Sequence, residues 1–287
     1  MFTLIYNPIA GNRRAERVLP RVTEELKRRS IDFVTLETVF PEDKTHYAHV
    51  PCSAQDTVCI IGGDGTVLNV LNQLPARTMH LITVPSGTGN DFIKCLHLPK
   101  DPIKALRRQL DAPQRLIDYA LASGEVFLNV FGMGFDVEVL KKLDQFKRKH
   151  AGLKAYLFAL VKAISEYKPH TCMVSVDGGA FRKCVFSILS AGNGQYIGGG
   201  MKAVPQADVS DGLLNVVEVK PVKKRHLLIL LPLFIFGFHV KAGLGKMYRC
   251  RTLTIKGENL SYEIDGEIRS ADTIHLSLVS GELTFSH

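Results

Sequence analysis

The feature that most constrains the fold of this chain is a pattern that occurs three times in its N-terminal third. Each time, a short apolar strand is followed by a loop of small residues and then by a helical segment. Strands that alternate with helices are typical of a parallel sheet with right-handed crossovers. We therefore predict a three-layer α/β domain with a parallel sheet over residues 1–120. Its strands are expected at residues 2–6, 33–38, 58–61 and 80–84.

From about residue 115 the pattern changes to short strands separated by glycine and aspartate turns. A hairpin is expected around Ser123-Gly124, followed by helical stretches at residues 136–143 and 153–167. Further strands are expected at residues 172–176, 185–191, 213–219, 253–255, 260–264 and 274–279. Such a series is typical of an antiparallel sandwich or barrel. We predict a second domain, an antiparallel β-sandwich over residues 121–287, and it stays open whether its last strand returns to the first domain.

The three loops of the first domain predict a nucleotide site. Loop 1 is Asn7-Pro8-Ile9-Ala10-Gly11, loop 2 is Gly62-Gly63-Asp64-Gly65-Thr66, and loop 3 is Pro85-Ser86-Gly87-Thr88-Gly89-Asn90-Asp91. Glycine lets backbone N–H groups approach an anion closely, and a helix N-terminus adds further donors. Asp64 would repel a phosphate unless Mg²⁺ lay between them. One such loop is more often a tight turn, but three at strand ends of one sheet indicate a nucleotide with Mg²⁺.

Several other classes of protein are excluded or disfavoured. The net charge of +8 favours anionic partners such as a nucleotide, a nucleic acid or an anionic membrane. The chain has no GxxxxGK[ST] motif, which argues against a P-loop NTPase, and loop 2 is not a GxGxxG fingerprint. The arginine-rich segment after loop 1 has no interleaved aromatic residues, so no nucleic-acid partner is expected.

The cysteines and the N-terminus predict a cytoplasmic location. The six cysteines lie far apart and form no CxxC motif, which favours reduced thiols over a disulfide framework or a zinc finger. The first residues have neither a basic n-region nor a small-residue cleavage site, so no signal peptide is expected.

An apolar run at residues 227–240 has two interpretations. It is interrupted by Pro232, Gly237 and His239, and it is shorter than the roughly 20 residues that a membrane span needs. Basic residues flank it on both sides, which suits a helix lying on an anionic membrane surface. A helix packed on the sandwich, with solvated flanks, explains the pattern equally well. We expect peripheral membrane contact and leave open whether the run inserts.

The combination of motifs resembles the diacylglycerol kinase catalytic-domain family, in its bacterial-type stand-alone lipid kinase form. Loops 2 and 3, the latter continuing into Phe92, carry the resemblance in the first domain. In the second domain it is carried by residues 193–201, by residues 205–214 and by the turn Asp265-Gly266-Glu267. Loop 2 alone also occurs in NAD kinases, whereas the whole set is far more specific. Ser86 departs from the family, which often has alanine or leucine there.

The resemblance implies that ATP is the co-substrate, bound by the first domain in a cleft between the two. The positions that match the family's nucleotide-binding residues are Asn7, Pro8, Ile9, Ala10, Gly11, Thr38, Gly62, Gly63, Asp64, Gly65, Thr66, Val67, Leu68 and Thr88. Thr38 matches through its place at the end of the second strand.

The resemblance also implies catalytic and metal-binding residues. Glu267 matches the family's proton acceptor, with Asp265 close by, and Asp64 is expected to hold the Mg²⁺ that bridges the ATP oxygens. A second, structural Mg²⁺ would be bound by the side chain of Asp211 and the backbone carbonyls of Asp208 and Leu213. A carboxylate that accepts the proton of an alcohol helps it to attack a phosphoryl group.

The predicted reaction transfers a phosphoryl group from ATP to the hydroxyl of a lipid alcohol, with diacylglycerol as the first candidate. A sphingoid base, ceramide or monoacylglycerol stays open, and so does a homodimer. The first alternative is an NAD kinase, disfavoured because residues 208–213 and the apolar run suit a lipid acceptor. The second is a non-catalytic lipid-binding or regulatory protein with the kinase fold, disfavoured because Asp64 and Glu267 are both intact.

Overall fold

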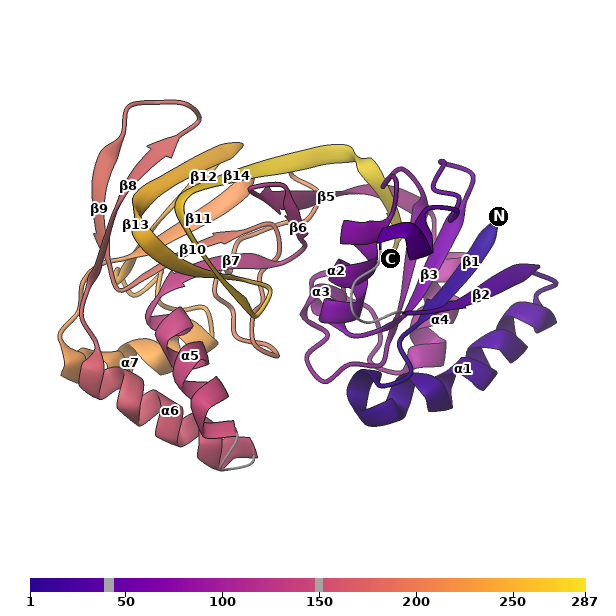
Figure 1. The fold of residues 1–287 in the computed structure, drawn as a ribbon, viewed down its shortest axis with the longest axis horizontal. Helices are drawn as coiled ribbons and strands as arrows, with labels where there is room; N and C mark the ends of the chain where they lie inside the picture. The colour runs from indigo at the N-terminus through magenta and orange to yellow at the C-terminus, as the bar shows by residue number, and fades with distance from the viewer. Residues whose placement is uncertain (39–43, 148–151) are drawn as a thin grey trace. The chain divides into compact units, whose positions relative to one another are not determined.

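The computed structural model describes residues 1–38, 44–147 and 152–287 (Figure 1). The chain divides into two compact units. Unit 1 comprises Met1–Tyr119, Val209–Gly212 and Val279–His287, and unit 2 comprises Ala120–Asp208 and Leu213–Leu278. The last nine residues and the short segment at 209–212 therefore belong with the N-terminal part of the chain.

Unit 1 is built on a parallel sheet. Its strands β1 (Phe2–Tyr6), β2 (Phe33–Glu37), β3 (Thr57–Gly62) and β4 (His80–Pro85) lie in the order β2-β1-β3-β4, and each adjacent pair is parallel. The end of β14 (Glu267–Ser286) adds to this sheet, since Thr284 and Phe285 pair in parallel with β4. All six residues of β4 are buried, as expected for a parallel strand covered on both faces.

Helices cover both faces of this sheet. Two of them, α1 (Ala10–Arg28) and α4 (Pro102–Asp111), bury apolar residues in one cluster with Leu4, Ile61 and Val84. The helix α2 (Asp64–Gln73) packs on β3, whose alternate residues point to the opposite face. The short α3 (Asp91–Cys95) and the 3₁₀ turn η1 (Lys44–Tyr47) complete the unit. The prediction of a three-layer α/β fold is confirmed.

Unit 2 is formed mainly by antiparallel strands. They are the end of β5 (Gln114–Ala122), whose first six residues belong to unit 1, together with β6 (Glu125–Phe127), β7 (Val130–Gly134), β8 (His170–Val176), β9 (Arg182–Phe186), β10 (Ile188–Gly192), β11 (Leu214–Val219), β12 (Gly245–Cys250), β13 (Thr252–Ile264) and the first part of β14. The main order is β12-β11-β10-β7-β13-β14, with β8 paired to β13 and β9 to β8. Strands that are not neighbours, such as β8 and β11, bury side chains in the same core around Phe131 and Phe186. The sheet therefore folds over itself as the predicted sandwich.

Three helices of unit 2 share a second core. They are α5 (Phe135–Lys147), α6 (Gly152–Glu166) and α7 (Lys224–Ile235), and they lie together in Figure 1. Phe135, Leu160, Leu230 and Phe234 belong to one apolar cluster. Within the described residues, no helix combines the length and the apolarity that crossing a bilayer requires.

The apolar run at 227–240 forms a shorter helix than its length suggests. The helix α7 contains Pro232 and ends at Ile235, and Gly237 follows with a φ of +75°. Leu227, Leu230 and Phe234 are buried, whereas Leu228, Ile229, Phe236 and Phe238 are exposed. One face of the run is thus core, and the other is an exposed apolar surface.

Candidate active site

The strand order of unit 1 indicates at which edge of its sheet a ligand is expected to bind. From β1 the chain continues to β2 on one side, whereas from β3 it continues to β4 on the other, so the order reverses between β1 and β3. In open α/β sheets, ligands bind outside the carboxyl ends of the strands at such a reversal. Loops 1 and 2 follow β1 and β3, and they therefore flank the expected binding position.

A side chain of loop 1 connects it to loop 2. The Nδ2 atom of Asn7 donates to Oγ1 of Thr66 over 3.3 Å, while its Oδ1 accepts from the backbone N–H of Ile9 over 3.2 Å. The backbone N–H of Asn7 donates to the carbonyl of Ile61. Two residues predicted to bind the nucleotide thus also hold the two loops together.

Glycines allow the three loops to approach backbone to backbone. Gly11 has a φ of +59°, and a Cβ atom there would lie 1.7 Å from the carbonyl oxygen of Ser86. A Cβ atom on Gly87 would lie 2.5 Å from Cα of Gly63. Any other residue at these positions would force the loops apart, so the loops form one cluster at the edge of the sheet.

Asp64 connects loop 2 to loop 3. Its Oδ2 and Oδ1 atoms accept hydrogen bonds from the backbone N–H groups of Asp91 and Phe92, over 2.8 and 3.0 Å. Burial raises the pKa of Asp64, and these two hydrogen bonds oppose that shift. Each carboxylate oxygen keeps a further lone pair, so the predicted contact with Mg²⁺ is compatible with this geometry and stays a prediction.

Replacing Asp64 by asparagine tests whether it holds loops 2 and 3 together, binds Mg²⁺, or does both. The amide would place an NH₂ group against one backbone N–H of α3, which costs about 1–3 kcal/mol of stability. We therefore expect a lower melting temperature and weaker ATP binding both with and without Mg²⁺. Calorimetric titration with ATP, with MgATP and with EDTA present measures this. A loss of affinity confined to MgATP would contradict the positioning role, and an equal loss with and without Mg²⁺ would contradict the proposed contact with Mg²⁺.

Thr38 has the geometry of a ligand-binding hydroxyl. It follows β2 directly, and its backbone N–H donates to the carbonyl of Tyr6. Its side chain is buried, and Oγ1 has no hydrogen-bond partner among the described residues. A buried hydroxyl without a partner costs free energy, so Oγ1 is available to a bound molecule.

The other predicted nucleotide-binding residues differ in exposure. Ile9, Gly65 and Thr88 are exposed, and Pro8 and Ala10 are partly buried. The side chains of Val67 and Leu68 are buried, so only their backbone atoms could serve a nucleotide. Asn90, to which the sequence assigned no role, closes loop 3 because its side chain accepts from the N–H of Gly87 and donates to the carbonyl of the same residue.

The Asp265-Gly266-Glu267 turn in unit 2 contains two carboxylates with different surroundings. Asp265 accepts hydrogen bonds from the backbone N–H groups of Leu128, Asn129 and Val130, which ties the turn to the start of β7. Glu267 is 59% exposed and pairs with Arg269 over 2.8 Å. Of the two, Glu267 is the carboxylate accessible to a substrate.

Two further carboxyl groups near this turn were missed by the sequence analysis. Glu263 on β13 is fully buried, and one of its oxygens accepts from the N–H of Gly266 over 2.6 Å. Asp136 lies in the first turn of α5. Burial raises the pKa of Asp136 to about 7 and raises that of Glu263 well above its ordinary value. A glutamate between Tyr262 and Ile264 in a buried strand was the available signal.

An apolar cavity that opens to solvent lies in unit 2, with about 570 Å³ of space when the solvent at its mouth is included. Residues of α5, α7, β10 and the segment before β11 line it together with Gly266, and its surface is almost entirely apolar although Asp136 belongs to the lining. Its lining residues are Phe135, Asp136, Val139, Leu140, Ile188, Ile197, Gly198, Met201, Leu231, Phe234 and Gly266. The cavity therefore combines a large apolar wall with a buried carboxyl group.

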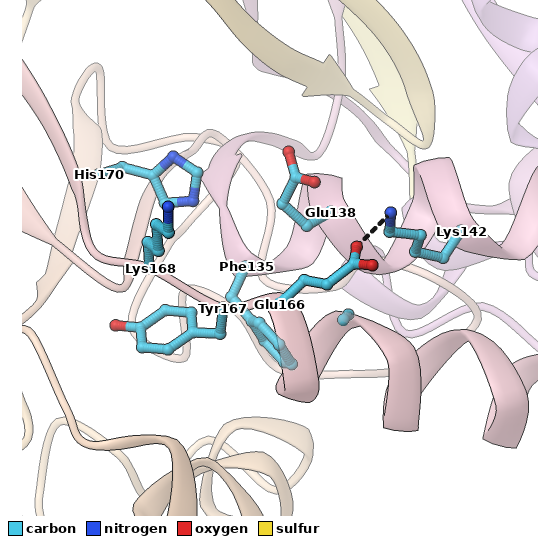
Figure 2. Close-up of a pocket in the computed structure, with 8 residues that line it drawn as sticks. Phe135, Glu138, Lys142, Glu166, Tyr167, Lys168 and His170 are labelled. Atoms are coloured by element: carbon cyan, nitrogen blue, oxygen red, sulfur yellow. Dashed lines mark ion pairs between the residues drawn. The ribbon is translucent and has the colours of Figure 1, made fainter.

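A second pocket of unit 2 is different in character. Figure 2 shows it at the junction of α5, α6 and β8, with the Lys142 ammonium directed to the carboxylate of Glu166 at 2.5 Å. Tyr167 bonds to Ser187 over 2.6 Å, and burial lowers the pKa of His170. None of the predicted site residues lines this pocket, and its principal charges are paired with each other.

The residues predicted to hold a structural Mg²⁺ divide between the units. Asp208 and Leu213 belong to unit 2, whereas Asp211 belongs to unit 1. The intervening segment is held by Asp118, whose backbone N–H donates to the carbonyl of Val209 and whose carboxylate accepts from the N–H of Gly212. Within the described part of the chain, no three His, Cys, Asp or Glu side chains form a metal-binding group. The proposed site uses only one such side chain, and it stays a prediction.

Comparison with known proteins identifies the family. Residues 1–122 match the model of the diacylglycerol kinase catalytic domain, and residues 129–286 match that of the YegS C-terminal NAD kinase beta sandwich-like domain. The chain belongs to the diacylglycerol kinase catalytic-domain family, which confirms the resemblance found in the sequence and makes the chain a member of a kinase family.

Individual proteins resemble the chain in sequence or in fold. A diacylglycerol kinase of Mycobacterium tuberculosis is 27% identical over 98% of this chain and 93% of its own length. The crystal structure of a diacylglycerol kinase from Bacillus anthracis has a TM-score of 0.77 at 24% identity, covering 99% of this chain and 95% of that one. An NAD kinase from Archaeoglobus fulgidus in complex with ATP shares the fold, with a TM-score of 0.53 at 16% identity over 100% and 94% of the two chains.

Proposed function

We propose that this chain transfers a phosphoryl group from ATP to the hydroxyl of a lipid alcohol, with diacylglycerol as the first candidate. The observation that carries the proposal is the open cavity with an almost wholly apolar lining in a member of a kinase family. Burial of each methylene of an acyl chain contributes about 0.8 kcal/mol. NAD is charged and polar throughout, so this cavity favours a lipid over NAD as the acceptor.

ATP binds at the edge of unit 1 where loops 1, 2 and 3 meet. Backbone N–H groups of the glycine-rich loops and of the first turn of α2 are suited to the phosphates. Thr38 offers its unpartnered hydroxyl to the nucleotide, and Asp64 holds loops 2 and 3 in register. Mg²⁺, when bound, neutralises charge on the phosphate oxygens, and we assign its ligands to Asp64 and, for the structural ion, to Asp211 with the carbonyls of Asp208 and Leu213.

Glu267 accepts the proton of the lipid hydroxyl. It is the exposed carboxylate of its turn, and Arg269 pairs with it while also pairing with Glu125. Asp265, close by, supports the turn through its hydrogen bonds from three backbone N–H groups. A proton acceptor of this kind contributes about 10²–10⁴-fold to the rate.

The exposed face of α7 and α6 contacts an anionic membrane in this proposal. Leu228, Ile229, Phe236 and Phe238 are exposed on or just after α7, and Phe158 and Val161 are exposed on the adjacent α6. The exposed cations Lys223, Lys224, Arg225 and Lys241 flank this apolar face. Each cation near an anionic bilayer contributes about 1 kcal/mol. Because Leu231 and Phe234 of α7 also line the cavity, a lipid could pass from this face into it.

The reaction is tested by supplying [γ-³²P]ATP and Mg²⁺ with diacylglycerol in vesicles, with NAD, and with ceramide, a sphingoid base and monoacylglycerol in parallel. We expect label in a lipid phosphate and none in NADP. Label in NADP alone would replace the proposal with an NAD kinase. Label in no acceptor, with ATP binding intact, would favour the non-catalytic alternative.

Membrane contact is tested by a double variant, Leu228→Ser with Ile229→Ser. Both side chains are more than half exposed, so the fold should tolerate the change, whereas burial of each in the bilayer contributes about 1.5–3 kcal/mol. We expect at least tenfold weaker flotation with vesicles containing phosphatidylserine. Val34→Ser, which removes an exposed apolar residue of unit 1, is the matched control. Unchanged flotation of the double variant would contradict the proposed contact.

A further inference from the structure

Gly132 on β7 lies between two buried carboxyl groups. A Cβ atom at this glycine would lie 2.4 Å from Oδ2 of Asp136 and 2.6 Å from Oε1 of Glu263. The two oxygens are therefore at most about 5 Å apart. Both are inaccessible to solvent, and neither has a hydrogen-bond partner among the described residues.

Two buried carboxylates at this separation cannot both carry a negative charge, because repulsion adds to the cost of desolvation. A proton retained by one of the two groups removes its charge, so the pair then carries at most one negative charge. Burial raises the pKa of Asp136 to about 7, and burial together with repulsion from Asp136 raises the pKa of Glu263 well above its ordinary value.

The other charged groups near Asp136 and Glu263 raise the pKa values of the pair further. Glu138, in the same first turn of α5, raises the pKa of Asp136, and Asp265 raises that of Glu263. The ammonium group of Lys141, the neighbouring cation of α5, donates hydrogen bonds to Glu138 and to the hydroxyl of Ser261. On the remaining side, the N–H of Gly266 donates to Oε2 of Glu263 and partly stabilises its charged form.

We propose that Asp136 and Glu263 share one proton, and that Glu263 is a positioning residue. Through the shared proton, Glu263 sets the charge that Asp136 presents at the wall of the apolar cavity. Through the N–H of Gly266, it holds the turn that carries Glu267. The kinetic consequence rests on the proposed lipid kinase function, whereas the shared proton does not.

The shared proton makes the stability of the protein depend on pH. Below about pH 4 the groups are protonated in both the folded and the unfolded protein. As the pH rises from about 4 to 7, the unfolded chain releases these protons while the folded pair retains them, so stability falls. The melting temperature of the wild type should therefore decrease between pH 5 and pH 8.

Glu263→Gln tests this independently of catalysis. Glutamine can donate to Asp136 and accept from Gly266, so the pair no longer needs the proton. We expect the decrease in melting temperature between pH 5 and pH 8 to fall to less than half of the wild-type value. Glu258→Gln, an exposed glutamate of the same strand, should behave like the wild type. If Glu263→Gln does not fold, Asp136→Asn serves in its place with the same expectation. A variant that keeps the full wild-type dependence on pH would overturn the proposal.

The pH profile of kcat/KM for lipid phosphorylation tests the positioning role. We expect the wild-type profile to change near neutral pH, where Asp136 titrates. In Glu263→Gln the neighbouring acid is gone and the pKa of Asp136 falls, so this change in kcat/KM should occur at least one pH unit lower. A superimposable profile would show that Glu263 only fills space. If the wild type phosphorylates no lipid, the proposed function fails, and the melting experiment still decides whether the proton is shared.

Discussion

Replacing Glu267 by glutamine should lower the turnover of lipid phosphorylation by about 10²–10⁴-fold, because the amide keeps the shape of the side chain but cannot accept a proton. ATP binding should survive, since the residues proposed to hold ATP all belong to unit 1. Steady-state kcat at saturating ATP and calorimetric titration with ATP measure the two effects on the same preparation.

The matched control for this change is Glu125→Gln. Glu125 pairs with the same Arg269 and is 37% exposed, so its replacement removes a comparable ion pair without removing the proposed base. An exposed ion pair contributes only about 0–1 kcal/mol, and both variants should melt near the wild-type temperature. Equal loss of turnover in the two variants would assign the effect to Arg269 and the turn rather than to proton transfer.

Retained turnover in Glu267→Gln would move the proton acceptor to another group. Asp265 is the neighbour in sequence, but three backbone N–H groups occupy its carboxylate. Asp136 lines the apolar cavity and would be the next candidate. The alternative that Glu267 only stabilises its turn predicts a lower melting temperature with little kinetic loss.

Gly11→Ala should abolish detectable ATP binding and lower the melting temperature by several degrees. Its new Cβ atom would lie 1.7 Å from the carbonyl oxygen of Ser86, and its φ of +59° is unfavourable for alanine. Loops 1 and 3 would have to separate, which would dismantle the cluster proposed to bind the phosphates. Thermal melting and titration with ATP measure both effects.

Gly124→Ala is the control that separates the backbone strain of a positive φ from the steric clash between a new Cβ atom and its neighbours. Gly124 also has a positive φ, of +95°, but a Cβ atom there would have no neighbour within 4 Å. This variant should lose about 1 kcal/mol of stability, the approximate conformational cost, and should bind ATP normally. Gly11→Ala with the same small effect would mean that loops 1 and 3 need not touch.

Much of unit 1 could be predicted because its pattern is local. Apolar strands, loops of small residues and helices succeed one another within short stretches, and the parallel sheet follows from that alternation. The regular part of α1 begins only after Gly11, Asn12 and Arg13, which all have left-handed backbone angles. The predicted nucleotide-binding loops lie at one edge for the same reason.

Other features depend on contacts between residues far apart in the chain. Thr66 and Asp64 were recognised as parts of a motif, but their bonds to Asn7 and to the start of α3 required the loops to meet. The exposed face of α7 could not be separated from its buried face, because a uniformly apolar run has no polar residues to mark the boundary.

The sequence by itself determined the order of strands and helices, the glycine-rich loops and the family motifs, because each depends on residues close together in the chain. Only the tertiary structure decided that the last strand ends in unit 1, that an apolar cavity opens beside Gly266, and that Asp136 and Glu263 meet over Gly132. Asp136 and Glu263 are separated by most of unit 2 in sequence. Burial and repulsion act on them only after β7, β13 and α5 have packed together, so no local pattern could indicate their shared proton.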